Sequence, residues 1–199
     1  RDRSVSRGLG DVYKRQNNEG GRAACQGNWP VFRQMRTSQF MTWTDPLLDS
    51  YLADLVEAER VGRNLVTEKY GRMMESTAPQ DFHDNIEPYI PRLSDERIAT
   101  QEHVIATQVA WAEDFRARYP KLGRAMRVLR TAEDTAQSTS FETYLRGELG
   151  TYSERTMALY RRFVDDLLRK GRNLTEETIA HTVALAGFAD LAEAEAAQG

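Results

Sequence analysis

One stretch of this chain occurs twice: residues 32–70 align without a gap to residues 141–179. The two copies share identical residues at equivalent positions, namely Phe32/Phe141, Thr42/Thr151, Tyr51/Tyr160, Arg60/Arg169, Gly62/Gly171, Arg63/Arg172, Asn64/Asn173, Leu65/Leu174 and Glu68/Glu177. A repeated helical unit leaves apolar faces that the two copies have to bury together. The repeat therefore predicts an all-α, pseudo-twofold helical bundle of about seven or eight helices.

Apolar residues recur at helical spacing along most of the chain, and the β-branched residues do not alternate as in strands. The pattern predicts helices over residues 28–43, 45–61, 65–75, 94–118, 141–149, 153–170, 174–186 and 188–197. Residues 78–93 contain Pro79, Pro88 and Pro91, which predicts a loop. Residues 119–138 are weakly periodic, which predicts mostly irregular structure.

Composition excludes several classes of function. The only cysteine is Cys25, so the chain forms no internal disulfide, and we expect a cytoplasmic location and no zinc site. No apolar run approaches the length of a membrane span, so we expect no membrane role. Residues 17–199 hold 22 basic and 28 acidic residues, and this net charge of −6 argues against nucleic-acid binding. No motif names a cofactor, so the cofactor stays unknown.

The first sixteen residues differ from the rest. Residues 1–16 resemble a translated sequencing-adapter artefact, common in genes assembled from metagenomic reads, so we set them apart from a single all-α domain at residues 17–199. A helix precedes the second copy, and its counterpart before the first copy would fall in this tail. We therefore expect a truncated N-terminus and an uncovered apolar groove near Trp29, Phe32 and Phe40.

The repeated Gly-Arg-Asn-Leu motif (residues 62–65 and 171–174) predicts a helix corner. Glycine suits the left-handed position after one helix, and asparagine caps the next. Capping does not explain Arg63 and Arg172. Each either pairs with a carboxylate of the protein or holds an anion in a cleft between the copies.

Tyr144, Glu148 and Tyr152 are spaced at i, i+4 and i+8, which predicts that they share one helical face. This face is either the wall of a ligand pocket, with Glu148 as a base if burial raises its pKa, or a half-buried aromatic pair around a carboxylate. Glu142 and Arg146 have the spacing of a helix salt bridge. The charged residues of the segment 68–75 fit a solvated ion-pair face.

Several short segments together resemble a known family. They are residues 17–23, 25–26, 36–40, 62–65, 68–70, 73–77, 138–145 and 151–153. This set of residues resembles an uncharacterised bacterial family, domain of unknown function 4125, over about residues 17–195. The resemblance implies no activity and no catalytic residue. Because some relatives are joined to a nucleotidyltransferase-like domain, it implies such a domain as a partner.

Two functions remain open. In the first, the domain is a binding or accessory module that holds a small polar or anionic ligand, or a partner domain, between its repeats. In the second, it is an enzyme that uses Glu148 or Glu142 as acid–base, with an arginine stabilising charge. The candidate residues are Arg63, Arg172, Tyr144, Glu148, Tyr152 and Glu142. A buried Glu148 beside an arginine and an open cavity would favour the enzyme.

Overall fold

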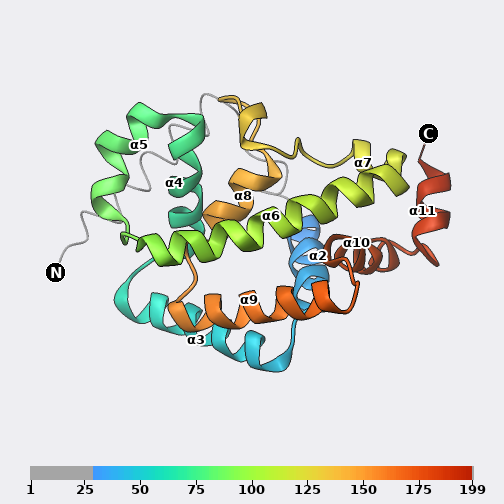
Figure 1. The fold of residues 1–199 in the computed structure, drawn as a ribbon, viewed down its shortest axis with the longest axis horizontal. Helices are drawn as coiled ribbons and strands as arrows, with labels where there is room; N and C mark the ends of the chain where they lie inside the picture. The colour runs from blue at the N-terminus through green and yellow to red at the C-terminus, as the bar shows by residue number, and fades with distance from the viewer. Residues whose placement is uncertain (1–28, 199) are drawn as a thin grey trace.

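A computed structural model describes residues 29–198 of the chain. The described residues form ten α-helices and two 3-10 turns, and they contain no β-strand (Figure 1). The helices are α2 (Trp29–Phe40), α3 (Asp45–Val61), α4 (Leu65–Thr77), α5 (Pro79–Asn85), α6 (Asp95–Arg118), α7 (Pro120–Arg124), α8 (Phe141–Leu149), α9 (Glu154–Arg169), α10 (Leu174–Leu185) and α11 (Leu191–Ala197). The all-α fold is thus confirmed, with more helices than the sequence predicts.

The helices pack around α6, the longest of them (Figure 1). Helix α6 contacts α8, α9 and α10, and α3 lies along α9. Two further contacts join segments far apart in the chain, because α4 packs on α8 and α2 packs on α10. The main core lies among these helices and includes an aromatic cluster around Trp43.

Both glycine corners form as the repeat predicts. Gly62 and Gly171 have φ values of 75° and 64°, in the left-handed region that glycine adopts without strain. Asn64 and Asn173 then cap α4 and α10. The side chain of each accepts a hydrogen bond from the backbone N–H of the residue three positions later in the chain. Local backbone chemistry explains both corners.

Two segments predicted as irregular contain helix. Residues 78–93 hold α5 and a 3-10 turn, Glu87–Tyr89, so the loop prediction is wrong. Pro79 ends α4 and also begins α5. Proline suits the first turn of a helix because the backbone N–H that it lacks would have no partner within the helix there. Phe82 and Ile86 anchor the segment to α4 by packing against Met74. Pro120 begins α7 in the same way, within residues predicted as mostly irregular.

The N-terminal predictions are not tested. Residues 1–28, which include the adapter-like tail, lie outside the described residues. The side chain of Trp29 is 67% exposed to solvent among the residues that the structure describes. Phe40 packs against the main core, so that part of the expected groove is partly covered. The groove and its missing helix stay a prediction.

Candidate functional site

A cavity of about 330 Å³ lies among α2, α4, α8 and α10. We call it the central cavity. Each helix turns one face toward the cavity, with side chains that recur at helical spacing. They are Phe32, Met35, Arg36 and Gln39 on α2, Val66, Lys69 and Tyr70 on α4, Phe141, Tyr144, Leu145 and Glu148 on α8, and Leu174, Thr175, Thr178 and Ile179 on α10. This volume falls within the range of about 300–1,000 Å³ that is typical of small-molecule sites.

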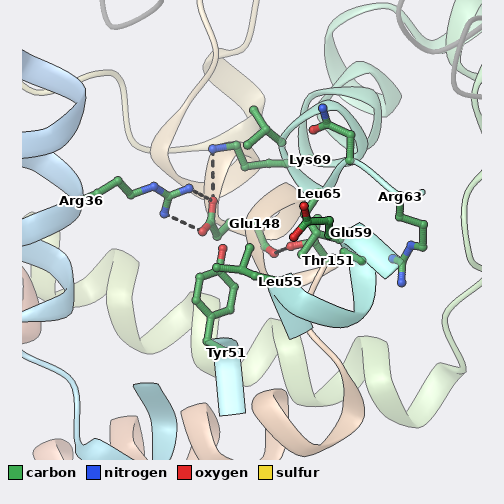
Figure 2. A pocket seen from close by; sticks show the side chains of 12 residues that line it. Arg36, Tyr51, Leu55, Glu59, Arg63, Leu65, Lys69, Glu148 and Thr151 are labelled. Atoms are coloured by element: carbon green, nitrogen blue, oxygen red, sulfur yellow. Dashed lines mark hydrogen bonds and ion pairs between the residues drawn. The ribbon is translucent and has the colours of Figure 1, made fainter. Parts of the chain in front are cut away.

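An ion cluster of Arg36, Lys69 and Glu148 forms one wall of this cavity. The Glu148 carboxylate accepts hydrogen bonds from Arg36 Nη1 at 2.7 Å and Nη2 at 3.2 Å, and Lys69 Nζ lies 3.1 Å from its Oε2. Figure 2 shows Arg36 and Lys69 reaching Glu148 from two directions. Two cations thus converge on one carboxylate, and the cluster carries a net positive charge.

The cluster is buried, and burial strengthens the electrostatic interactions among its charges. The side chains of Lys69 and Glu148 are only 4% and 5% exposed, and that of Arg36 is 17% exposed. Burial of the Glu148 carboxyl opposes its ionisation, but the charges and hydrogen bonds of Arg36 and Lys69 outweigh burial and lower its pKa. The condition for Glu148 as a base of raised pKa is therefore not met. Glu148 is an ionised counter-ion at neutral pH.

Tyrosines surround the cluster. Lys69 Nζ donates to the Tyr144 hydroxyl at 2.8 Å and lies 4.2 Å from the centroid of the same ring. Arg127, an exposed residue outside the cluster, places its guanidinium over the same ring, 4.6 Å from the ring centroid. Tyr51 points its hydroxyl end toward Glu148 (Figure 2), and burial together with the Glu148 charge raises the pKa of Tyr51 to about 12. The Tyr51 hydroxyl therefore stays protonated at neutral pH.

A second cavity, of about 290 Å³, lies next to the ion cluster. We call it the side cavity. Arg36, Lys69 and Glu148 line both cavities, so the cluster is their shared wall. Arg63 also lines the side cavity, but Figure 2 shows it away from Glu148.

The family model for proteins of unknown function DUF4125 matches residues 9–196 of the chain. The chain belongs to this family. Searches of curated proteins and of solved structures found no match. The resemblance seen in the sequence is thereby confirmed.

The structure separates the two repeated arginines. Arg63 donates to Glu68 at 2.6 Å, and Arg172 donates to Glu177 at 2.6 and 2.7 Å. Each therefore pairs with a carboxylate of the protein, which was one of the two interpretations. Arg172 is exposed and lines neither cavity, so the two arginines do not meet around one ligand.

The three residues predicted on one helical face do not share one. Helix α8 ends at Leu149, so Tyr152 follows a turn and is buried in the aromatic cluster against Trp43. Tyr144 and Glu148 do face the central cavity together. Glu142 lies apart, where it accepts from Thr131 N at 2.8 Å and from Arg146 at 3.2 Å, which confirms the predicted helix salt bridge.

Arg36 and Lys69 are functional candidates that the sequence pattern did not reveal. The prediction that the charged residues of segment 68–75 are solvated is wrong for Glu68 and Lys69, which are 4% and 3% exposed. A signal existed in Gly147, where a Cβ would lie 2.8 Å from the backbone oxygen of Lys69. A glycine on the α8 face allows α4 to approach so closely that Lys69 is buried against α8.

Proposed function

We propose that this DUF4125 domain binds a small anionic molecule with an apolar body in its central cavity. The observation that carries the proposal is the excess of positive charge on a mostly apolar wall. Arg36, Lys69 and Arg127 line the cavity, and Glu148 is the only carboxylate among its described lining residues. Buried charges are costly unless they are paired, so an anion of the ligand would complete the balance.

The apolar part of the cavity supports the second half of the proposal. Its lining includes the side chains Phe32, Met35, Phe141, Leu145 and Ile179. Such a surface favours a hydrocarbon or aromatic body over a bare inorganic ion. The ligand class that fits best is therefore a small organic acid.

We further infer that α2–α4 and α8–α10 are two copies related by a pseudo-twofold axis through this cavity. Two features support the inference. The contacts pair the first helix of each copy with the third of the other and the two second helices with each other. The cavity-lining positions also correspond in the repeat, with Met35 equivalent to Tyr144 and Gln39 equivalent to Glu148.

This arrangement gives the cavity a polar end and an apolar end. The charged residues of the ion cluster have uncharged counterparts in the repeat, because Arg36, Lys69 and Glu148 correspond to Leu145, Thr178 and Gln39, which also line the cavity. A ligand with one anionic end would therefore bind in a single orientation. The difference between the copies, more than their likeness, would determine specificity.

A second candidate function is an enzyme with Glu148 as the base. The geometry that favours it is a buried Glu148 beside Arg36 on a cavity wall. The lowered pKa of Glu148 makes the carboxylate a weaker base, so binding comes first. Exchange of a ligand proton with deuterated water, present in the wild type and lost in Glu148→Gln, would support the enzyme.

Native mass spectrometry of the purified full chain tests the binding proposal. We expect the wild type to carry an organic acid that is lost in Lys69→Met, because this variant removes a cavity cation. Lys170→Met is the matched control, since Lys170 is exposed and lines neither cavity. Absence of any bound acid, together with no thermal shift on addition of a panel of aromatic and aliphatic carboxylates, would refute the proposal.

A further inference from the structure

Trp43 carries a buried hydrogen-bond donor without an acceptor. The residue follows α2 and is 6% exposed, with the rings of Phe40, Tyr51 and Tyr160 at centroid distances of 5.1, 5.5 and 5.6 Å. Its indole Nε1 is buried and has no hydrogen-bond partner in the part of the chain that the structure describes. Buried donors of this kind are rare in folded proteins, so this one calls for an explanation.

The position of Trp43 supplies that explanation. Trp43 lines the central cavity, the same cavity that carries the ion cluster. The other buried atom without a partner, among the residues described, is Arg116 Nε, whose guanidinium still donates through Nη2 to two backbone carbonyls. Arg116 lines neither cavity. Of the residues that the structure describes, only Trp43 therefore combines such a donor with a place on the wall of either cavity.

A second polar group lies close to Trp43. The Tyr160 hydroxyl accepts a hydrogen bond from Gln108 Nε2 at 3.0 Å, and both residues line the central cavity. A tyrosine hydroxyl that accepts one hydrogen bond keeps its own proton for donation. Burial raises the pKa of Tyr160, so that proton stays in place at physiological pH.

We propose that Trp43 Nε1 donates a hydrogen bond to a neutral carbonyl-type oxygen of the ligand. This inference rests on the proposed function and narrows its ligand class to a small apolar or aromatic acid with an additional carbonyl oxygen. The acid group binds at Arg36 and Lys69, and the neutral oxygen binds at Trp43. A carbonyl oxygen has two lone pairs, so it accepts from Tyr160 as well. Indole offers only a donor, which excludes a ligand ammonium group at this position because that group has no acceptor.

Two matched probes test the inference on the intact chain. 4-Acetylbenzoate and 4-isopropylbenzoate share the carboxylate and the ring, and they differ in having or lacking the acceptor oxygen. The phenylacetate analogues, one methylene longer, provide a second spacing. The measurements are the dissociation constant of each probe and the indole N–H signals in ¹⁵N-correlated NMR spectra, where the Trp43→Phe variant identifies the signal of Trp43 among the three tryptophans.

We expect the acetyl probe of at least one pair to bind about three- to tenfold more tightly than its isopropyl partner, the gain of one hydrogen bond. The Trp43 indole N–H signal should shift downfield with the acetyl probe only. In Trp43→Phe the difference between the two probes should shrink, leaving only the contribution of Tyr160, and in Lys69→Met both should bind weakly. The comparison of probes on the wild type does not depend on the folding of either variant.

The outcomes separate the two proposals. Equal binding of acetyl and isopropyl probes in both pairs, with an unchanged Trp43 signal, would overturn the role of Trp43 and leave the anion site standing. Failure of all four probes to bind or to shift any signal would count against the organic-acid site itself, and with it the present inference. Tighter binding of the isopropyl probes would also overturn the inference, because it would mean that the subsite at Trp43 is purely apolar.

Discussion

Replacing Glu148 with glutamine removes the carboxylate that Arg36 and Lys69 share in the ion cluster. The Glu148 side chain is 5% exposed and holds Arg36 at 2.7 Å and Lys69 at 3.1 Å. Without its charge, Arg36 and Lys69 remain buried together and repel each other. Loss of one partner from a buried ion pair costs about 3–5 kcal/mol, so we expect Glu148→Gln to lower the free energy of unfolding by about that amount.

Glu177→Gln is the matched control. It also removes a carboxylate paired with an arginine, but the side chains of Arg172 and Glu177 are 51% and 25% exposed. Solvent screens such a pair, and its loss costs about 0.2–1 kcal/mol. Urea unfolding followed by circular dichroism measures both variants. A cost for Glu148→Gln no larger than that for Glu177→Gln would refute the assignment of the cluster as a strongly coupled buried unit.

The stability that Glu148 contributes should depend on pH, and the direction follows from its lowered pKa. The pKa of Glu148 is lowered in the folded state from its ordinary value of 4.5, so the unfolded chain takes up the proton first. The stabilisation is therefore fully present above about pH 4.5 and is lost as the pH falls through the folded-state pKa. The difference between wild type and Glu148→Gln should stay constant from pH 7 to pH 5 and shrink below pH 4. A difference that grows on acidification would contradict the ionised state of Glu148.

Three further changes test the surrounding scaffold. Gly147→Ala would place a Cβ 2.8 Å from the backbone oxygen of Lys69, so we expect a loss of about 1–3 kcal/mol in stability and weaker binding of the organic acid, measured by urea unfolding and calorimetry. Arg97→Met would leave the Leu149 carbonyl without its 2.8 Å donor, and we expect about 1–3 kcal/mol of destabilisation; no change in melting temperature would argue against this role. Asn64→Ala removes the α4 cap and should cost about 1 kcal/mol in urea unfolding, whereas Asn64→Gly should cost only a few tenths.

The helix corners were predictable because their causes are local. Gly62 ends α3 in the left-handed conformation, and Asn64 caps the next helix two residues later. A side chain and backbone groups within a few residues decide such a corner, and they recur at Gly171. Local signals gave a wrong prediction at Pro79, where a loop was expected. Pro79 stops one helix and starts another, and the second helix is stabilised by the packing of Phe82, which is not a local signal.

The ion cluster was only partly predictable. Glu148 and Tyr144 stood out as places where the copies differ, and both do line the central cavity. Their partners Arg36 and Lys69 come from two other helices, and Lys69 sits in a charged run whose pattern is typical of a solvated face. Burial of a lysine depends on which helix covers it, and here the cover comes from α8.

The sequence by itself determined that this chain is all-α and where its glycine corners lie, because helix periodicity, left-handed glycines and capping asparagines act within a few residues. Its residues also carried the resemblance to the family to which the chain belongs. The tertiary structure alone decided that α4 lies against α8, which buries Lys69 beside Glu148, and that Trp43 lines the cavity with a donor left without a partner. These are long-range outcomes: the desolvation and pairing of charges depend on helices brought together from distant parts of the chain, and residue spacing within one helix does not encode them.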